Sequence, residues 1–347
     1  MQGRFPRLAA AALILAVTVV TVVKLGEGDG GTRPAATTAG EGASILQGSA
    51  AAPPAGATAS ETTGEAEQAR ALSATPGTNG AVAVTDGEHL YAAGAHRHRL
   101  ARRLSARAFV AVDADTGEVL LAYRETRRRP IASLTKVMTG LLVAEAGELE
   151  REVLVMPWST RVEPNRDGLI AGHRYPRRTL LFSAMLASNN DAAEALGVDL
   201  GGTAGNFYNA MNLRAEELGL TSTRYASASG LEDVRNTSTA LDQALLLRAA
   251  LGDATFARVS GTWRVRVPWE PPTHAKVYEN HNKMLRTYEG TYAGKTGWTT
   301  RAKGCLAVAV ERDGHRIVAV VLGADDIWRD MPVLVDTALA RARKAAA

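Results

Sequence analysis

Apolar and polar positions first alternate regularly near residue 107. Residues 108–123 contain two apolar runs of strand length around an Asp-Thr-Gly turn, a pattern that predicts a β-hairpin. From Ile131 onward, apolar residues recur at steps of three and four, which predicts a helix, and Pro130 stands at its start, where proline is tolerated. The first structured elements are therefore a hairpin followed by a helix.

Apolar periodicity also predicts helices and strands in the remainder of the chain. Helical spacing predicts further helices at 178–198, 204–218 and 238–251. Two apolar runs, 305–312 and 316–324, flank an Asp-Gly pair and predict a second strand pair, which a C-terminal helix follows from about Met331. Strands at both ends around a helical middle indicate a single α+β domain over 107–347.

The N-terminal segment, residues 1–24, has the layout of an export signal. Arg4 and Arg7 precede a predominantly apolar run from Leu8 to Val23. No small-x-small cleavage site follows directly, so we favour an uncleaved membrane anchor over a cleaved signal peptide, with the remaining chain outside the cytoplasm.

Residues 25–106 read as a disordered linker, because Gly, Ala, Thr, Ser and Pro dominate and large apolar residues are scarce. A basic segment at the end of the linker and the start of the domain contains Arg97, Arg99, Arg102, Arg103 and Arg107. This basic segment either lies against anionic headgroups or wall polymers, or is a solvated part of the linker, the interpretation we favour.

Composition removes several classes of function. The formal net charge is +4, and outside the basic segment the Lys and Arg residues are dispersed, so we expect no nucleic-acid partner. Cys305 is the only cysteine, which excludes an intramolecular disulfide, a multi-cysteine zinc site and lipidation on an N-terminal cysteine. No His-Glu-x-x-His motif occurs either, so we expect neither a metal nor a cofactor.

Candidate chemistry begins at Ser133 and Lys136, three residues apart at the start of the predicted helix. This spacing puts both side chains on one face. A serine hydroxyl becomes a strong nucleophile when a base removes its proton, and a lysine is such a base when burial or a nearby cation lowers its pKa. The motif alone is weak, because Ser-x-x-Lys occurs by chance about once in a chain of this length.

Two later motifs strengthen the prediction. Ser188-Asn189-Asn190 follows an apolar helical run, and Lys295-Thr296-Gly297 precedes the last strand pair. Ser-x-x-Lys, Ser-x-Asn and Lys-Thr-Gly, in this order, are the set shared by penicillin-binding proteins and class A β-lactamases. A second hydroxyl relays a proton to the leaving amine, and an edge strand with a cation and a hydroxyl binds a terminal carboxylate.

With these motifs the chain resembles the low-molecular-mass D-alanyl-D-alanine carboxypeptidases, from about Arg107 onward. The stretches DADTGEVL, RRPIASLTKVMTGLL, LLFSAMLASNNDAAEAL and KTGWT also match that pattern. The resemblance implies a five-stranded antiparallel sheet flanked by helices, with a mostly helical subdomain. It also implies peptidoglycan stem peptides as substrate and β-lactam antibiotics as covalent inhibitors.

The resemblance also implies a role for each site residue. Ser133 forms the acyl-enzyme, Lys136 takes its proton and Ser188 relays the proton. Asn190 and Lys295 position the substrate and the lysine, and Thr296 binds the carboxylate. The backbone amides of Ser133 and Trp298 form the oxyanion hole, and Gly297 lets the substrate approach the strand.

Three positions depart from the family pattern. Lys303 follows Ala302 where the family usually has glycine, and Gly294 stands where a larger apolar residue commonly precedes the lysine. His281 occupies a position where some relatives carry a carboxylate-binding arginine, so it is either a substrate contact or a structural histidine.

Two alternatives stay open. A class A β-lactamase needs a glutamate in a Glu-x-x-x-Asn loop, and Glu232 to Asn236 fits that spelling, although the carboxypeptidase resemblance already accounts for this stretch. A catalytically impaired wall-binding module is the other alternative. The motifs also leave the acceptor open, since water gives carboxypeptidase or endopeptidase activity and a second peptide gives cross-linking.

Overall fold

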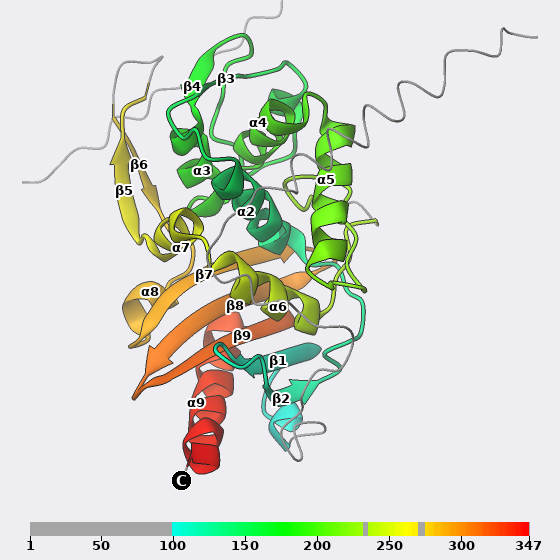
Figure 1. Cartoon of the computed structure of the whole chain (residues 1–347), viewed down its shortest axis with the longest axis vertical. Helices are drawn as coiled ribbons and strands as arrows, with labels where there is room; N and C mark the ends of the chain where they lie inside the picture. The colour runs from blue at the N-terminus through cyan, green and yellow to red at the C-terminus, as the bar shows by residue number, and fades with distance from the viewer. Residues whose placement is uncertain (1–98, 232–234, 270–274, 347) are drawn as a thin grey trace, which may run out of the picture. The chain divides into compact units, whose positions relative to one another are not determined.

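The computed structural model describes residues 99–231, 235–269 and 275–346 (Figure 1). Its main sheet has five antiparallel strands in the order β2-β1-β9-β8-β7. These strands are β1 (Ala108–Asp113), β2 (Val119–Tyr123), β7 (Thr291–Thr299), β8 (Lys303–Arg312) and β9 (His315–Ala324). The first and last parts of the domain therefore pair side by side, which confirms the expected α+β fold and five-stranded sheet.

The two faces of the sheet belong to two different cores. Val110 and Val320 face one core, which is shared with the helical part of the domain. Phe109 and Val321 face the other, which is closed by α9 (Ile327–Ala346). Figure 1 shows α9 on one side of the sheet and α6 (Ala240–Ala250) on the other. Burial on both faces explains why these strands read as nearly continuous apolar runs.

The helical part packs around α2 (Lys136–Ala146), which contacts most of its helices. The other elements are α3 (Arg177–Met185), α4 (Asn190–Gly201), α5 (Ala204–Glu217), α7 (Ala254–Gly261), α8 (Met284–Thr287), two small sheets of β3 (Glu152–Leu154) with β4 (Arg174–Pro176) and β5 (Arg264–Val267) with β6 (Lys276–Glu279), and the 3-10 turns η1 (Arg99–Arg102), η2 (Ala132–Thr135) and η3 (Ser159–Arg161).

The predicted hairpins and most predicted helices are confirmed, and the β8–β9 turn shows why. Asp313 and Gly314 both have positive φ, 52° and 76°. Two central residues with positive φ match the twist of a tight hairpin, and Asp-Gly is a favoured pair there.

The expected single helix over 178–198 is wrong. The structure has two helices, α3 and α4, and residues 186–189 separate them. Ser188 in this break has a φ of +61°, which a continuous helix does not allow. Apolar periodicity runs through the break because both helices bury residues against the same core, so the pattern alone does not reveal it.

Two boundaries also differ from those expected. The C-terminal helix begins at Ile327, because the Asp326 side chain accepts hydrogen bonds from the backbone N–H groups of Trp328 and Arg329 at 3.0 and 3.1 Å and caps it. Residues 99–106, which we expected in the linker, pack on the domain, since Leu100 and Leu104 are buried in the core beneath α9. The remainder of the expected linker and the N-terminal segment lie outside the described residues.

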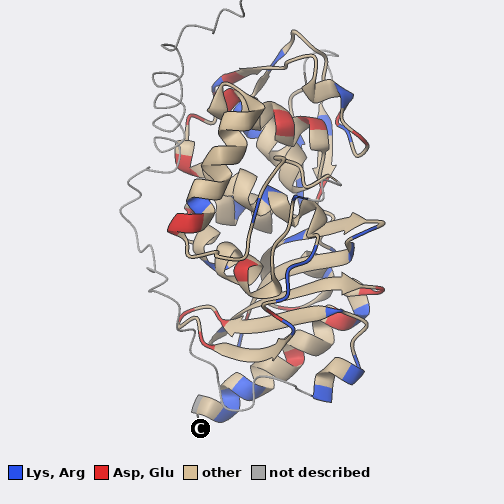
Figure 2. Ribbon diagram, turned by 90° about the vertical axis from the view of Figure 1, so that its right-hand side faces the viewer, with Lys and Arg blue, Asp and Glu red and all other residues tan. Residues whose placement is uncertain are grey.

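Charged residues are distributed over both parts of the domain, and Lys and Arg also occupy the C-terminal end of α9 (Figure 2). Arg343 and Lys344 lie in the last turn of α9, where their positive charges interact favourably with the negative end of the helix dipole.

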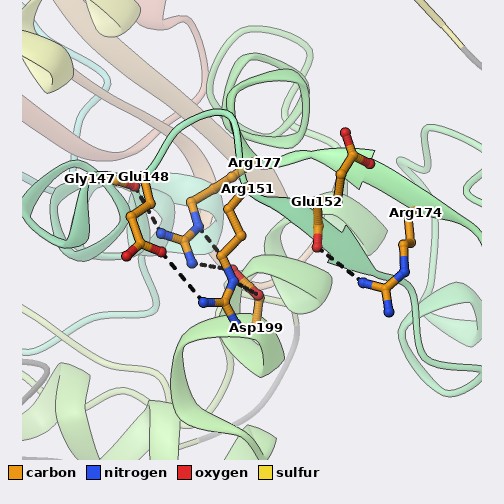
Figure 3. Close-up of polar contacts among 7 residues, drawn as sticks. All are labelled: Gly147, Glu148, Arg151, Glu152, Arg174, Arg177 and Asp199. Carbon is orange, nitrogen blue, oxygen red and sulfur yellow. Dashed lines mark hydrogen bonds and ion pairs between the residues drawn. The ribbon is translucent and has the colours of Figure 1, made fainter.

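A buried arginine ties three helices of the helical part together (Figure 3). Arg177, at the start of α3, donates through Nε and Nη2 to Asp199 Oδ2 on α4 at 2.9 and 2.6 Å. Its Nη1 donates to the carbonyl of Gly147, which ends α2, at 2.8 Å. Arg151 adds a longer contact to the same carboxylate, 3.2 Å from its Nε to Oδ1. This network holds together the start of α3, the end of α2 and the C-terminal part of α4, which lies at the opposite end of that helix from Asn190.

Lys303, one of the departures from the family pattern, has a φ of +61°. A left-handed conformation costs a non-glycine residue about 1–2 kcal/mol, and glycine costs about 0.5–1 kcal/mol in unfolded-chain entropy. We expect Lys303→Gly to raise the free energy of unfolding by about 0.5–1 kcal/mol in urea denaturation. Lys303→Ala is the control, because it removes the charge but keeps Cβ; equal stabilisation by both variants would contradict this explanation.

Candidate active site

Ser133 lies in the 3-10 turn η2, directly before α2, and Gly297 of β7 packs against its backbone. A Cβ on Gly297 would lie 3.0 Å from both Ser133 N and Ile131 O. Gly230 is equally constrained from another side, since its φ is +79° and a Cβ there would collide with the carbonyl oxygen of Ala132. The turn that carries Ser133 is therefore held between two glycines from distant parts of the chain.

Lys136 is fully buried one turn after Ser133. Its Nζ lies 3.0 Å from Ser133 Oγ, 2.7 Å from Asn190 Oδ1 and 2.7 Å from the carbonyl oxygen of Ser229. Asn190 Oδ1 and the Ser229 carbonyl only accept hydrogen bonds, so they take the two protons of a neutral amine. The amine lone pair is then directed at the Ser133 hydroxyl, which has a proton to give.

The electrostatic surroundings favour that neutral form. The pKa of Lys136 is held well below its usual range, first because burial disfavours the ammonium ion and second because Lys295 repels it, while Glu194 and Asp191 act in the opposite direction. A lysine with this environment is suited to accept a proton from a serine near neutral pH.

Ser188 and Lys295 form a second pair beside the first. Ser188 lies in the break between α3 and α4, and its Oγ accepts a hydrogen bond from Lys295 Nζ at 2.9 Å. Lys295 Nζ also donates to the carbonyl of Thr296 at 2.9 Å. Burial lowers the pKa of Lys295 to about 7. The left-handed conformation at Ser188 is what turns its side chain towards β7.

Asn190 begins α4 and is anchored on its other side. Its Nδ2 donates to the Glu163 carbonyl at 3.1 Å, and its backbone N–H donates to the Asn165 carbonyl at 2.8 Å. Because the Nδ2 group points to a carbonyl, the amide oxygen faces Lys136.

These side chains surround an open cleft of about 1170 Å³. The sequence-predicted residues Ser133, Ser188, Asn190, Thr296, Gly297 and Trp298 line it, and the side-chain nitrogens of Lys136 and Lys295 reach Ser133 and Ser188 from the protein interior. Trp298 is the most exposed of them, at 67%. The structure thus brings all eight predicted site residues together, although they come from three separate stretches of sequence.

His281 also lines the cleft, so its position agrees with a substrate contact. Its backbone N–H donates to the Leu186 carbonyl at 3.1 Å, which also gives it a structural role. Burial, Lys295 and Lys136 together lower the pKa of its imidazole. The ring is therefore a neutral hydrogen-bonding group at neutral pH.

Gly294, the other departure, is required by its neighbours. A Cβ there would lie 2.5 Å from the Ala307 carbonyl oxygen and 2.7 Å from Asn282 Nδ2. The buried Asn282 side chain occupies the space that a larger residue at 294 would need. The departure is thus compensated locally and leaves Lys295 in place.

Two carboxylates that the sequence reasoning did not single out support the site. Asp191 accepts hydrogen bonds from the backbone N–H groups of Asp167, Gly168 and Leu169 at 2.8–3.2 Å. Glu194 accepts those of Ala228 and Ser229 at 3.1 and 3.0 Å. Their signal in the sequence was positional: they follow Asn190 by one and four residues, so Glu194 shares its helix face.

Glu232, on which the β-lactamase alternative depends, lies outside the described residues. Asn236 of the same spelling is buried, and its amide is used within its own loop: Oδ1 accepts from Ala226 N and Nδ2 donates to Ser227 Oγ, both at 2.7 Å. Among the residues that the structure does describe, no group of three or more His, Cys, Asp or Glu side chains is placed to hold a metal ion.

The three motifs that penicillin-binding proteins and class A β-lactamases share meet at the edge strand β7 of an antiparallel sheet. A family model described as D-alanyl-D-alanine carboxypeptidase matches residues 95–326. The chain belongs to this family, as a serine-type D-alanyl-D-alanine carboxypeptidase hydrolase.

Curated relatives and solved structures agree with that assignment. The chain is similar to D-alanyl-D-alanine carboxypeptidase DacB2 of Mycobacterium tuberculosis, at 30% identity over 67% of this chain and 81% of the relative. It is also similar to a D-alanyl-D-alanine endopeptidase of Pseudomonas aeruginosa, at 30% identity over 65% and 73%.

Among solved structures, a D-alanyl-D-alanine carboxypeptidase from M. tuberculosis H37Rv superposes with a TM-score of 0.64, at 30% identity over 68% of this chain and 91% of that one. The Streptomyces K15 DD-transpeptidase also gives 0.64, at 27% identity over 68% and 98%. Within the described part of the chain, none of the helices is both long and apolar enough to cross a membrane.

Proposed function

We propose that this protein removes the terminal D-alanine from peptidoglycan stem peptides through an acyl-enzyme on Ser133, with water as the final acceptor. The observation that carries the proposal is the surroundings of Lys136 Nζ. Of its three neighbours, two are carbonyl oxygens and only the Ser133 hydroxyl has a proton to lose.

In the acylation step, Lys136 takes the proton of the Ser133 hydroxyl while Oγ attacks the carbonyl carbon of the penultimate D-alanine. The negative charge that develops on the carbonyl oxygen is stabilised by the backbone N–H groups of Ser133 and Trp298. The peptide bond then breaks, and the proton held by Lys136 passes through the Ser188 hydroxyl to the departing amine, so that Lys136 is neutral and Ser188 is protonated again when the acyl-enzyme has formed. Lys295 and Thr296 hold the terminal carboxylate of the substrate.

In the deacylation step, water attacks the ester carbonyl, the ester bond breaks and Ser133 recovers its proton. The acceptor needs its own test, because the similar proteins include a carboxypeptidase, an endopeptidase and a transpeptidase by name. The acyl-enzyme proposed for Ser133 can react with water or with a second peptide, so the products decide between these acceptors.

The test is to incubate the full-length protein, purified in mild detergent, with a disaccharide pentapeptide and to separate the products. Carboxypeptidase activity releases one D-alanine and leaves the disaccharide tetrapeptide. Cross-linked dimers would instead identify a transpeptidase. Ser133→Ala is the control, and full release by this variant would refute the mechanism.

Penicillin separates this proposal from the β-lactamase alternative. We expect a fluorescent penicillin to label Ser133 and to remain bound as an acyl-enzyme for minutes or longer. Repeated turnover of penicillin would support a β-lactamase, and a wild-type protein that fails to be labelled would support the impaired wall module.

Lys295 predicts the alkaline side of the pH profile. Its pKa of about 7 means that the ammonium ion loses its proton as the pH rises above 7, and the attraction for the substrate carboxylate is then lost. We expect kcat/KM, which reports the free enzyme, to fall about tenfold per pH unit above that point. A substrate with an amidated C-terminus is the matched control, since it has no carboxylate; an identical alkaline limb for both substrates would count against this role.

We also propose that the protein is held at the outer side of the cell membrane by residues 1–24. This rests on the two arginines before the apolar run from Leu8 to Val23. Membrane fractionation of the full chain and of a variant that lacks residues 1–24 tests it, because only the full chain should sediment with the membranes.

A further inference from the structure

Glu194 is a buried carboxylate that the mechanism above does not use. It is 3% exposed and lies on α4, four residues after Asn190, so both side chains are on the face that looks towards α2. Its Oε1 accepts hydrogen bonds from the backbone N–H groups of Ala228 and Ser229 at 3.1 and 3.0 Å, and its Oε2 accepts one from the hydroxyl of Tyr208 at 2.8 Å. Three donors compensate for the burial of this negative charge.

The segment that Glu194 holds is also the one that contacts Lys136. The carbonyl of Ser229 accepts a hydrogen bond from Lys136 Nζ at 2.7 Å, and the carbonyl of Ala228 accepts one from Thr139 Oγ1 at 2.7 Å. Both donors belong to α2. Residues 228–229 are thus clamped between α2 on the carbonyl side and the Glu194 carboxylate on the N–H side. The position of the Ser229 carbonyl depends on both.

Residues 228–229 and the Glu194 carboxylate lie within a small group of titratable side chains. Lys136 and Lys295 are buried lysines, Asp191 and Glu194 are buried carboxylates, and His281 lies at the cleft. Asp191 is occupied by the backbone of residues 167–169. Burial and the charge of Lys295 lower the pKa of Lys136, whereas the carboxylates of Glu194 and then Asp191 raise it. In a low-dielectric interior such effects are much larger than in water.

We propose that Glu194 is a positioning residue, which holds the Ser229 carbonyl against Lys136 and whose negative charge sets the pH range in which Ser133 is acylated. This inference rests on the proposed function, because it takes acylation of Ser133 as its readout. Glu194 does not touch the substrate. It acts on the reaction only through Lys136.

The two parts of the role have different consequences. Loss of the charge removes an interaction that favours protonated Lys136, so the amine becomes neutral at lower pH and acylation persists into more acidic solution. Loss of the contact frees the Ser229 carbonyl, so Lys136 is less well oriented and the maximum rate falls. A merely structural glutamate would affect stability and would leave the pH profile in place.

Glu194→Gln separates charge from contact. The glutamine Oε1 can accept both backbone N–H groups, and its Nε2 can donate to the Tyr208 oxygen. We expect the plateau rate of labelling by fluorescent penicillin to stay within about threefold of the wild-type rate. The acidic limb, where the labelling rate falls as the pH decreases, should move down by about one pH unit, which makes labelling about tenfold faster at a fixed pH on that limb. An acidic limb that stays in place or moves to higher pH would overturn the inference.

Two further variants complete the experiment. Tyr208→Phe removes one hydrogen bond from Glu194 but keeps the charge, and it should leave the acidic limb within about 0.3 pH units. Glu194→Asp keeps the charge on a side chain too short to reach residues 228–229, so its plateau should fall about tenfold while its limb stays. This opposite pattern also keeps the inference testable if the glutamine variant does not fold, and an unchanged plateau for Glu194→Asp would overturn it.

The same experiment distinguishes a failure of the proposed function from a failure of the role of Glu194. A wild-type protein that penicillin does not label would refute the acyl-enzyme on Ser133 and, with it, the role of Glu194. If penicillin labels the wild-type protein, but Glu194→Gln leaves the acidic limb of the labelling rate against pH unchanged, only the role of Glu194 would be refuted.

Discussion

Replacing Lys136 by methionine should lower the rate of Ser133 acylation by about 10²–10⁴-fold, the range that a positioned general base contributes. Methionine has a similar length but no basic nitrogen, so the Ser133 hydroxyl keeps its proton and stays a weak nucleophile. The loss should appear both in penicillin labelling and in D-alanine release, because the two reactions share the first step.

Lys283→Met is the matched control for this prediction. Lys283 is exposed and its ammonium group lies 5.5 Å from the centre of the Trp328 ring, so its contact is a surface one. Circular dichroism should show that both variants fold. If Lys136→Met labelled within about tenfold of the wild-type rate, another group would have to be the base and the proposed mechanism would fail.

Replacing Arg177 by methionine should have the largest effect on stability. The guanidinium is 3% exposed and joins α2, α3 and α4 through Asp199 and the Gly147 carbonyl (Figure 3). Breaking a buried ion pair leaves an uncompensated charge and typically costs about 3–5 kcal/mol. Arg151 continues to pair with Asp199, so we expect a loss near the lower end, about 3 kcal/mol.

Urea denaturation of Arg177→Met and of Arg178→Met tests this expectation. Arg178 is the next residue and forms an ion pair with Glu150, but both side chains are half-exposed or more, so its loss should cost about 1 kcal/mol or less. The double variant Arg177→Met/Asp199→Leu should recover part of the loss, because it removes the stranded carboxylate. If Arg177→Met and Arg178→Met lowered the free energy of unfolding equally, the buried ion pair of Arg177 would contribute no more to stability than the exposed one of Arg178.

The local elements follow from short-range rules. The Asp-Gly pair at 313–314 selects a tight turn, and the three-residue spacing of Ser133 and Lys136 puts both groups on one face at a helix start. Positions of this kind depend on turn geometry and helical periodicity, which neighbouring residues determine. These rules predict the two hairpins and the placement of Lys136 beside Ser133, whereas the five-stranded sheet and the role of each site residue were expected from the family resemblance that the three motifs carry.

Predictions failed where local pattern and tertiary contacts differ. The interval 178–198 has helical periodicity throughout, yet the chain breaks at Ser188, whose left-handed backbone turns the hydroxyl towards Lys295. Residues 99–106 are polar and basic enough to read as linker, yet Leu100 and Leu104 complete the core beneath α9. In both cases residues far away in sequence supply the stabilising contacts.

By itself, the sequence determined which residues are available for chemistry, their order, and the class of protein that uses them. Only the tertiary structure decided how they act on one another. Lys136, Ser188 and Lys295 are ordinary in isolation; burial lowers the pKa of both lysines, and the proximity of Lys295 lowers that of Lys136 further. Glu194 enters the site for the same reason, since its effect on Lys136 arises from a carboxylate held in the interior, where charges separated by many residues of sequence act over short distances in a low dielectric.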